Sequence, residues 1–193
     1  MLGIEAVGIQ TPPLRPRVVE IDPRTVSNTA TLGGAGAFLR FRPTDIVGLD
    51  LTLRSGSLRY VDTRDDHRNV ISQDLFVADV GTVLYLARGE MGSVGIDAGV
   101  GGVLNRVGYA IDDLDRSVQR FGSFVTRIGF DVELVTRRVA FVFTLRSLGV
   151  ITPQNDASHD GPVFDSATRE ETKPAVPRFQ TYVAAGAGVA YRF

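Results

Sequence analysis

Apolar residues recur at every second position along much of the chain. In the segment IVGLDLTLRSG one set of alternate positions is apolar: Val47, Leu49, Leu51 and Leu53. The positions between them are small, polar or charged: Gly48, Asp50, Thr52 and Arg54. Successive side chains of a β-strand point to opposite faces. The segment therefore predicts a strand with one apolar face and one charged face.

The same alternation recurs in residues 94–101, 124–134 and 139–146. Extended to the whole chain, it predicts eight strands, which cover residues 2–9, 29–42, 46–60, 70–87, 93–109, 117–134, 139–152 and 178–193. Helical periodicity is scarce. The pattern predicts an all-β chain that forms one domain, residues 1–193.

The connections between these strands alternate in length. Short segments follow the second, fourth and sixth strands, at residues 42–45, 87–93 and 135–138. Longer polar segments follow the other strands, at residues 10–28, 61–69, 110–117 and 153–177. Membrane-spanning β-barrels have this asymmetry, with short periplasmic turns and longer extracellular loops. We therefore predict an eight-stranded antiparallel up-and-down transmembrane β-barrel.

A soluble barrel or sandwich is the alternative, including a soluble ligand-binding barrel, with the apolar face inside and the charged face in water. Period-two alternation alone does not distinguish inside from outside. Two features favour the membrane: the strands are longer than the usual five or six residues, and the charged face is rich in glycine and arginine.

Composition narrows the function classes. The formal net charge of −1 excludes a polybasic nucleic-acid binder, so we expect no nucleic-acid partner. The absence of cysteine excludes disulfides and thiolate metal sites. No uncharged apolar run is long enough for a transmembrane helix, and the start MLGIEAVGIQ lacks the features of a signal peptide.

The inward face of the predicted barrel carries charges of both signs. The residues predicted to form this lumen charge network are Glu5, Arg40, Asp50, Arg54, Asp79, Asp97, Arg127, Asp131, Glu133, Arg146 and Arg192. Side chains fill the interior of an eight-stranded barrel, and buried charges are tolerated when they are paired. The near balance of charge favours a plugged lumen over an open pore.

The chain ends in the run GVAYRF, in which Gly188 is followed by Tyr191 and by Phe193 as the last residue. This run resembles the C-terminal assembly signal of bacterial outer-membrane β-barrel proteins. The whole-chain pattern resembles the small eight-stranded families typified by OmpA, OmpX and OmpW. The resemblance implies location in the outer membrane, contact with its lipid, and recognition by the barrel-assembly machinery during biogenesis.

Aromatic residues at the strand ends predict two interfacial girdles. The predicted periplasmic girdle comprises Phe41, Tyr85, Tyr191 and Phe193, and the outer one Tyr60, Tyr109, Phe121 and Phe179.

Candidates for catalysis or metal binding are weak. Both histidines, His67 and His159, fall in predicted loops. The run ASHDG (157–161) places serine, histidine and aspartate consecutively, whereas catalytic triads are assembled from separated positions. The acidic run 62–69 lacks the ligand spacing of a calcium loop. We expect no enzyme, cofactor or metal; a lipid-modifying barrel enzyme is the less favoured alternative.

The leading functional hypothesis is a structural or anchoring barrel whose outer loops, above all 153–177, contact a partner protein. The resemblance to OmpW implies an alternative, which is transport of a small hydrophobic ligand through a lateral opening. This alternative predicts an apolar pocket near the outer end, lined by Phe38, Leu75, Val77 and Val103.

Overall fold

Eight long strands make up most of the described structure. The computed structural model describes residues 1–11, 30–64, 67–111, 115–153, 163–164, 171–172 and 178–193. The long strands are β1 (Leu2–Thr11), β2 (Ala30–Phe41), β3 (Val47–Arg64), β4 (His67–Gly89), β5 (Gly92–Ile111), β6 (Asp115–Thr136), β7 (Val139–Ile151) and β10 (Phe179–Tyr191). Each overlaps one of the eight strands predicted from the sequence.

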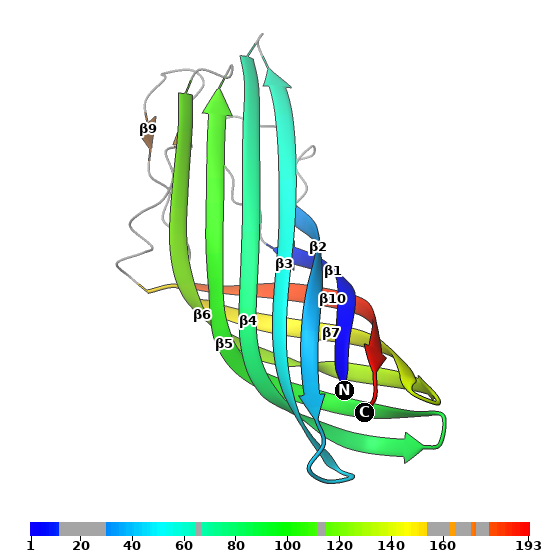
Figure 1. The fold of residues 1–193 in the computed structure, drawn as a ribbon. Helices are drawn as coiled ribbons and strands as arrows, with labels where there is room; N and C mark the ends of the chain where they lie inside the picture. The colour runs from blue at the N-terminus through cyan, green and yellow to red at the C-terminus, as the bar shows by residue number, and fades with distance from the viewer. Residues whose placement is uncertain (12–29, 65–66, 112–114, 154–162, 165–170, 173–177) are drawn as a thin grey trace.

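The strands form a closed antiparallel barrel in which each pairs with its neighbour in the chain (Figure 1). The first and last strands close it, with Leu2 opposite Tyr191 and Gln10 opposite Val183. Closure leaves no unpaired edge around the ring, as a sheet within hydrocarbon requires. The predicted fold class is confirmed. Within the described part of the chain, we find no helix with the length and apolar character needed to cross a membrane.

The two ends of the barrel differ. The connections 42–46, 90–91 and 137–138 lie at one end, here called the turn end, together with both termini (Figure 1). Thr44 Oγ1 accepts a hydrogen bond from the amide of Val47 at 3.0 Å, and an exposed Arg88–Asp45 ion pair joins two neighbouring turns. The amide of Arg192 donates to the carbonyl of Arg138 at 2.8 Å, so the end of the chain is held beside a turn.

At the opposite end, two of the predicted loops are largely strand. The pairing of β3 with β4 continues to Arg64 opposite His67, and that of β5 with β6 to Ile111 opposite Asp115. The prediction of long loops at 61–69 and 110–117 was wrong. These polar segments lack apolar alternation, yet their backbone groups still pair across each hairpin. Strands β3 to β6 therefore extend beyond the other four (Figure 1).

The segment 153–177 contains a small separate sheet that the sequence did not predict. Strand β8 (Val163–Phe164) pairs with β9 (Glu171–Thr172).

The outward face of the barrel is an apolar band. Ile128 and Phe130 on β6 are 61% and 56% exposed, while Arg127 and Asp131, which flank them, are 3% and 1% exposed. This distribution excludes the soluble alternative, which needs the apolar face inside. On β4 the band runs from Phe76 to Leu86, about eleven residues, which is the length of a strand that crosses a bilayer.

The girdle prediction is partly wrong. Phe41, Tyr191, Phe193 and Phe179 are exposed on the outward face, but Tyr85 and Phe121 are buried. Tyr85 and Phe121 are buried because alternate residues of a strand point to the same face. Tyr85 alternates with the inward Asp79 on β4, and Phe121 alternates with the inward Arg127 on β6. The side chains of Tyr60 and Tyr109 lie outside the described structure.

Candidate functional site: the barrel lumen

Layers of different chemistry fill the lumen. From the turn end upward, β7 contributes Ala140 and Val142, then Thr144 and Arg146, then Leu148 and Val150, all buried. Strand β10 adds Ala190 near the turn end and Tyr182 further up, with the small residues Gly186 and Ala184 opposite Thr144 and Arg146. Two apolar clusters therefore lie above and below a charged layer.

Arg127 lies at the centre of the charged layer. Its side chain is 0% exposed and forms ion pairs with three carboxylates, Asp50 at 3.3 Å, Asp97 at 3.5 Å, and Asp79. It also donates a hydrogen bond to Thr52 Oγ1 at 3.0 Å. One guanidinium from β6 thus binds carboxylates from β3, β4 and β5, which uses the several donors of arginine in its planar fork.

Arg146 and Arg40 bind the same group of carboxylates from other sides. Arg146 Nε donates to Asp97 at 2.6 Å, and its Nη2 lies 3.3 Å from Asp131. Arg40 Nη2 lies 2.5 Å from Asp131 and 3.3 Å from Asp50. Since Asp50 and Asp131 each accept from more than one guanidinium, the ion pairs form one connected network rather than isolated pairs.

Two further groups extend the network. Arg54 Nε donates to Glu5 at 2.6 Å, and its Nη1 lies 3.1 Å from Asp79. Nearer the turn end, Glu133 accepts from Arg40 at 2.6 Å and from the hydroxyl groups of Tyr85 and Ser93, each at 3.2 Å. Each of these carboxylates is therefore stabilised by charged or hydrogen-bond donors in a lumen where an unpaired charge would be costly.

The structure brings together ten of the eleven residues assigned to the network. Arg192 is only partly buried and makes no ion pair within the described residues. Arg42, which the sequence analysis left out, instead pairs with Glu133 and places its guanidinium 4.3 Å from the ring centroid of Tyr85. Its position in the sequence was the available signal, because residues two apart on a strand point to the same face and Arg42 stands two positions after the inward Arg40.

Glycines make room for the charged side chains. A Cβ at Gly186 would lie 2.7 Å from Glu5 Oε2 and 2.7 Å from Thr144 Oγ1. A Cβ at Gly36 would lie 2.9 Å from Glu5 Oε1. The glycine-rich character of the inward face therefore follows from the space that Glu5 and its arginine partner occupy.

An apolar layer fills the lumen above the charged one. Its buried side chains include Ile9, Leu32, Leu75, Val77, Val103, Leu148 and Tyr182. The side chains of Leu75, Val77 and Val103 are 0–1% exposed and pack together in this cluster. Phe38 is inward but belongs to the cluster at the turn end, with Ala140, Val142 and Ala190. The prediction that it lines an outer pocket was wrong, because Phe38 precedes Arg40 by one inward position and lies near the turn end of β2.

The residues of the suggested assembly signal take different faces of β10. Gly188 lies beside Glu5, where a Cβ would meet the Glu5 side chain at 2.9 Å. Tyr191 and Phe193 face outward, with their rings in an edge-to-face arrangement at 5.5 Å between centroids.

Chemically, this lumen holds fixed, mutually neutralising charges between apolar layers. Among the side chains described, no group of three or more histidine, cysteine or acidic residues is arranged to hold a metal ion. The run 157–161 and the side chains of the acidic run 62–69 lie outside the described structure. What the described arrangement can do is link strands across the barrel and stabilise it.

No protein-family model matches the chain, and no curated protein matches its sequence. Solved structures match in fold. Ail, the attachment invasion locus protein of Yersinia pestis, is 9% identical over 100% of this chain and 96% of its own, with a TM-score of 0.59. Ail has also been solved in complex with the heparin analogue sucrose octasulfate. Neisserial surface protein A is 10% identical over 100% of this chain and 96% of its own, with a TM-score of 0.50. The chain thus has the closed eight-stranded barrel fold of these bacterial surface proteins.

Proposed function

We propose that the protein is an integral barrel of the bacterial outer membrane that anchors an interaction surface on one side of the bilayer. The apolar outward band and the buried charges support membrane insertion, since the same strands would otherwise expose large apolar residues to water. The turn end would face the periplasm and the long strands the exterior, as in barrels with short periplasmic turns.

A passive role is favoured over transport because two layers block the lumen. The charged layer is held by ion pairs between nearly inaccessible side chains, and the side chains of the apolar layer above it are buried. A lateral route for a hydrophobic ligand would need a cavity at Leu75, Val77 and Val103, and these side chains are in contact with the core. We therefore propose that the barrel itself neither conducts nor catalyses.

The observation that carries the interaction role is the continuation of β3 to β6 above the apolar band. On β4 the outward apolar residues end at Asp74, which lies opposite Ser57 on β3. The pairing of β3 with β4 nevertheless continues to Arg64. Seven more residues of strand reach roughly 20 Å beyond the band. This paired sheet is a rigid platform, and rigid platforms are suited to present polar side chains to a partner. We propose a protein or polyanionic glycan of another cell surface as its partner.

The test removes the platform without disturbing the barrel. The register pairs Leu58 with Gln73 and Val107 with Gln119, so residues 59–72 and 108–118 can each be replaced by a short turn. Displayed on a Gram-negative cell, the trimmed protein should still show the heat-dependent gel shift of a folded barrel and should lose adhesion to immobilised surface proteins and glycans. In a control variant, the same two segments keep their length but carry a scrambled sequence. This control separates the effect of hairpin length from the effect of the side chains. Equal adhesion by the trimmed and full-length proteins would contradict the proposal.

A further inference from the structure

Two neighbouring rows of outward side chains cross β2 to β6 where the apolar band ends. The strand register places one row directly above the other. The lower row is mainly apolar: Ala35, Ser55, Phe76, Leu104 and Gly122. The upper row is polar and charged: Gly33, Ser57, Asp74, Arg106 and Arg120. The boundary between hydrocarbon and polar surroundings therefore falls between these rows.

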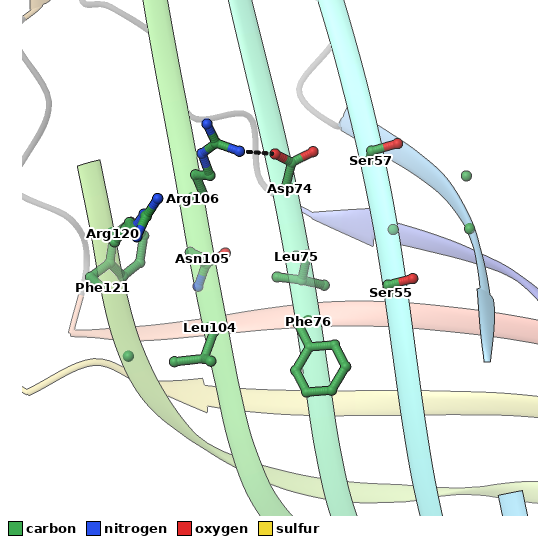
Figure 2. Close-up of a pocket in the computed structure, with 14 residues that line it drawn as sticks. Ser55, Ser57, Asp74, Leu75, Phe76, Leu104, Asn105, Arg106, Arg120 and Phe121 are labelled. Carbon is green, nitrogen blue, oxygen red and sulfur yellow. Dashed lines mark ion pairs between the residues drawn. The ribbon is translucent and has the colours of Figure 1, made fainter. Parts of the chain in front are cut away.

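The rows line a hollow of about 580 Å³ on the outer surface of the sheet. Glycines and serines create it, because Gly33, Gly122 and Ser55 fill little space between larger neighbours. Figure 2 shows Phe76 and Leu104 side by side at the lower edge, with Asp74 and Arg106 above them. Phe76 is 42% and Leu104 63% exposed, so both present apolar surface to whatever occupies the hollow.

The upper edge carries an excess of positive charge. Arg106 and Arg120 are directly opposite each other on β5 and β6. Asp74 lies 3.7 Å from Arg106, and both side chains are about half exposed, so this pair is loose. Asp74 can neutralise only one of the two arginines. No second carboxylate stands in this row among its described residues, and the edge keeps a net charge of +1.

An apolar floor with cations at its upper edge has the order of groups found in a phospholipid. The acyl chains of a lipid seated here would contact Phe76 and Leu104, and its phosphate would lie at the height of Arg106 and Arg120. Arginine binds phosphate oxygens through two parallel N–H donors. Basic residues near the membrane surface attract anionic lipid headgroups. A site for a soluble anion would not need an apolar floor.

We propose that this hollow binds a phosphorylated lipid of the leaflet on the long-strand side, with Arg106 and Arg120 on the phosphate. The proposal rests on the membrane location proposed above, because only an inserted barrel places the rows in a leaflet. The proposed lipid class is defined by two chemical groups, a phosphate monoester and acyl chains. Asp74 offsets the charge of Arg106 only, and Arg120 supplies the unneutralised charge.

The experiment uses the full chain refolded in micelles with added phosphatidic acid or phosphatidylcholine, and native mass spectrometry counts retained lipid. The site variant is Arg106→Gln with Arg120→Gln. The matched control is Arg88→Gln with Arg138→Gln, which removes two exposed arginines at the turn end. We expect the wild type and the control to retain phosphatidic acid over phosphatidylcholine. The site variant should bind phosphatidic acid roughly 10- to 30-fold more weakly, the effect of losing about two interfacial cations.

Heat-dependent gel mobility of every variant separates folding from binding. If the double site variant fails to fold, Arg120→Gln alone keeps the Asp74–Arg106 pair and should still weaken binding several-fold. Equal retention by site variant and wild type, both folded, would overturn the lipid site and leave the membrane barrel intact. Full displacement of phosphatidic acid by millimolar inorganic phosphate would also overturn it, because the anion alone would then suffice. A wild type that never shows the gel shift would instead refute the membrane location.

Discussion

Arg127 offers the sharpest test of the lumen. Replacing it with methionine keeps most of the side-chain volume and removes one positive charge from a site that is 0% exposed. Asp50, Asp79 and Asp97 each lose an ion-pair partner. Removing one member of a buried ion pair typically costs about 3–5 kcal/mol, because the remaining charge is left uncompensated. We expect Arg127→Met to lower the free energy of unfolding by about that amount.

The measurement is urea unfolding in phosphatidylcholine vesicles. Circular dichroism follows the strand signal, since the chain has no tryptophan to report by fluorescence. A double variant, Arg127→Met with Asp79→Asn, removes a carboxylate that keeps only Arg54 as its ion-pair partner and should recover at least about 1 kcal/mol relative to the sum of the single losses. Arg88→Met, in an exposed turn ion pair, should change stability by less than about 0.5 kcal/mol. A loss below about 1 kcal/mol for Arg127→Met, with additive behaviour of the pair, would refute the reasoning.

Three further predictions use the same refolded protein. Gly186→Leu should destabilise the barrel by about 1–3 kcal/mol, because its Cβ meets Glu5 and Thr144, whereas Gly8→Leu, where nothing lies within 4 Å, should be nearly neutral in the same urea titration. In planar bilayers the wild type should give no stepwise ionic current, since both lumen layers are packed; regular steps at low voltage would contradict the plug. Phe193→Ala should slow assembly into the outer membrane of living cells, measured by pulse labelling, while refolding in detergent stays unchanged, because the exposed ring contributes little to the folded barrel. An equal defect in detergent would assign Phe193 a structural role instead.

The sequence predicted the strands and their faces because a membrane barrel has two contrasting environments. Alternation from Val47 to Arg54 follows directly from lipid on one side and a charged lumen on the other. That contrast is lost in residues 61–69, at the tip of the β3–β4 hairpin, where most side chains are polar or charged. The extension of β3 and β4 to Arg64 and His67 therefore left no periodic signal.

The site was predicted less completely than the fold. Parity placed Arg40, Asp50 and Arg127 inside, but only three-dimensional register shows which charges meet across the lumen. Arg42 was missed because it was assigned to a turn, and Tyr85 was misplaced because its aromatic type was weighed above its parity. The two rows around Arg106 and Arg120 depend on the alignment of five strands, which alternation within a single strand does not reveal.

The network also bears on how faithfully the barrel assembles. Arg40 on β2 binds Glu133 on β6, and Arg54 on β3 binds Glu5 on β1, so these partners come from strands that are not neighbours in the sheet. A flat, unclosed sheet cannot bring Arg40 to Glu133, because three strands separate β2 from β6. A slip of one residue in any strand would turn its charges toward lipid and separate them from their partners. The ion pairs thus stabilise only the correctly aligned, closed ring. Partial opening of a single seam would also disrupt contacts on the far side of the barrel.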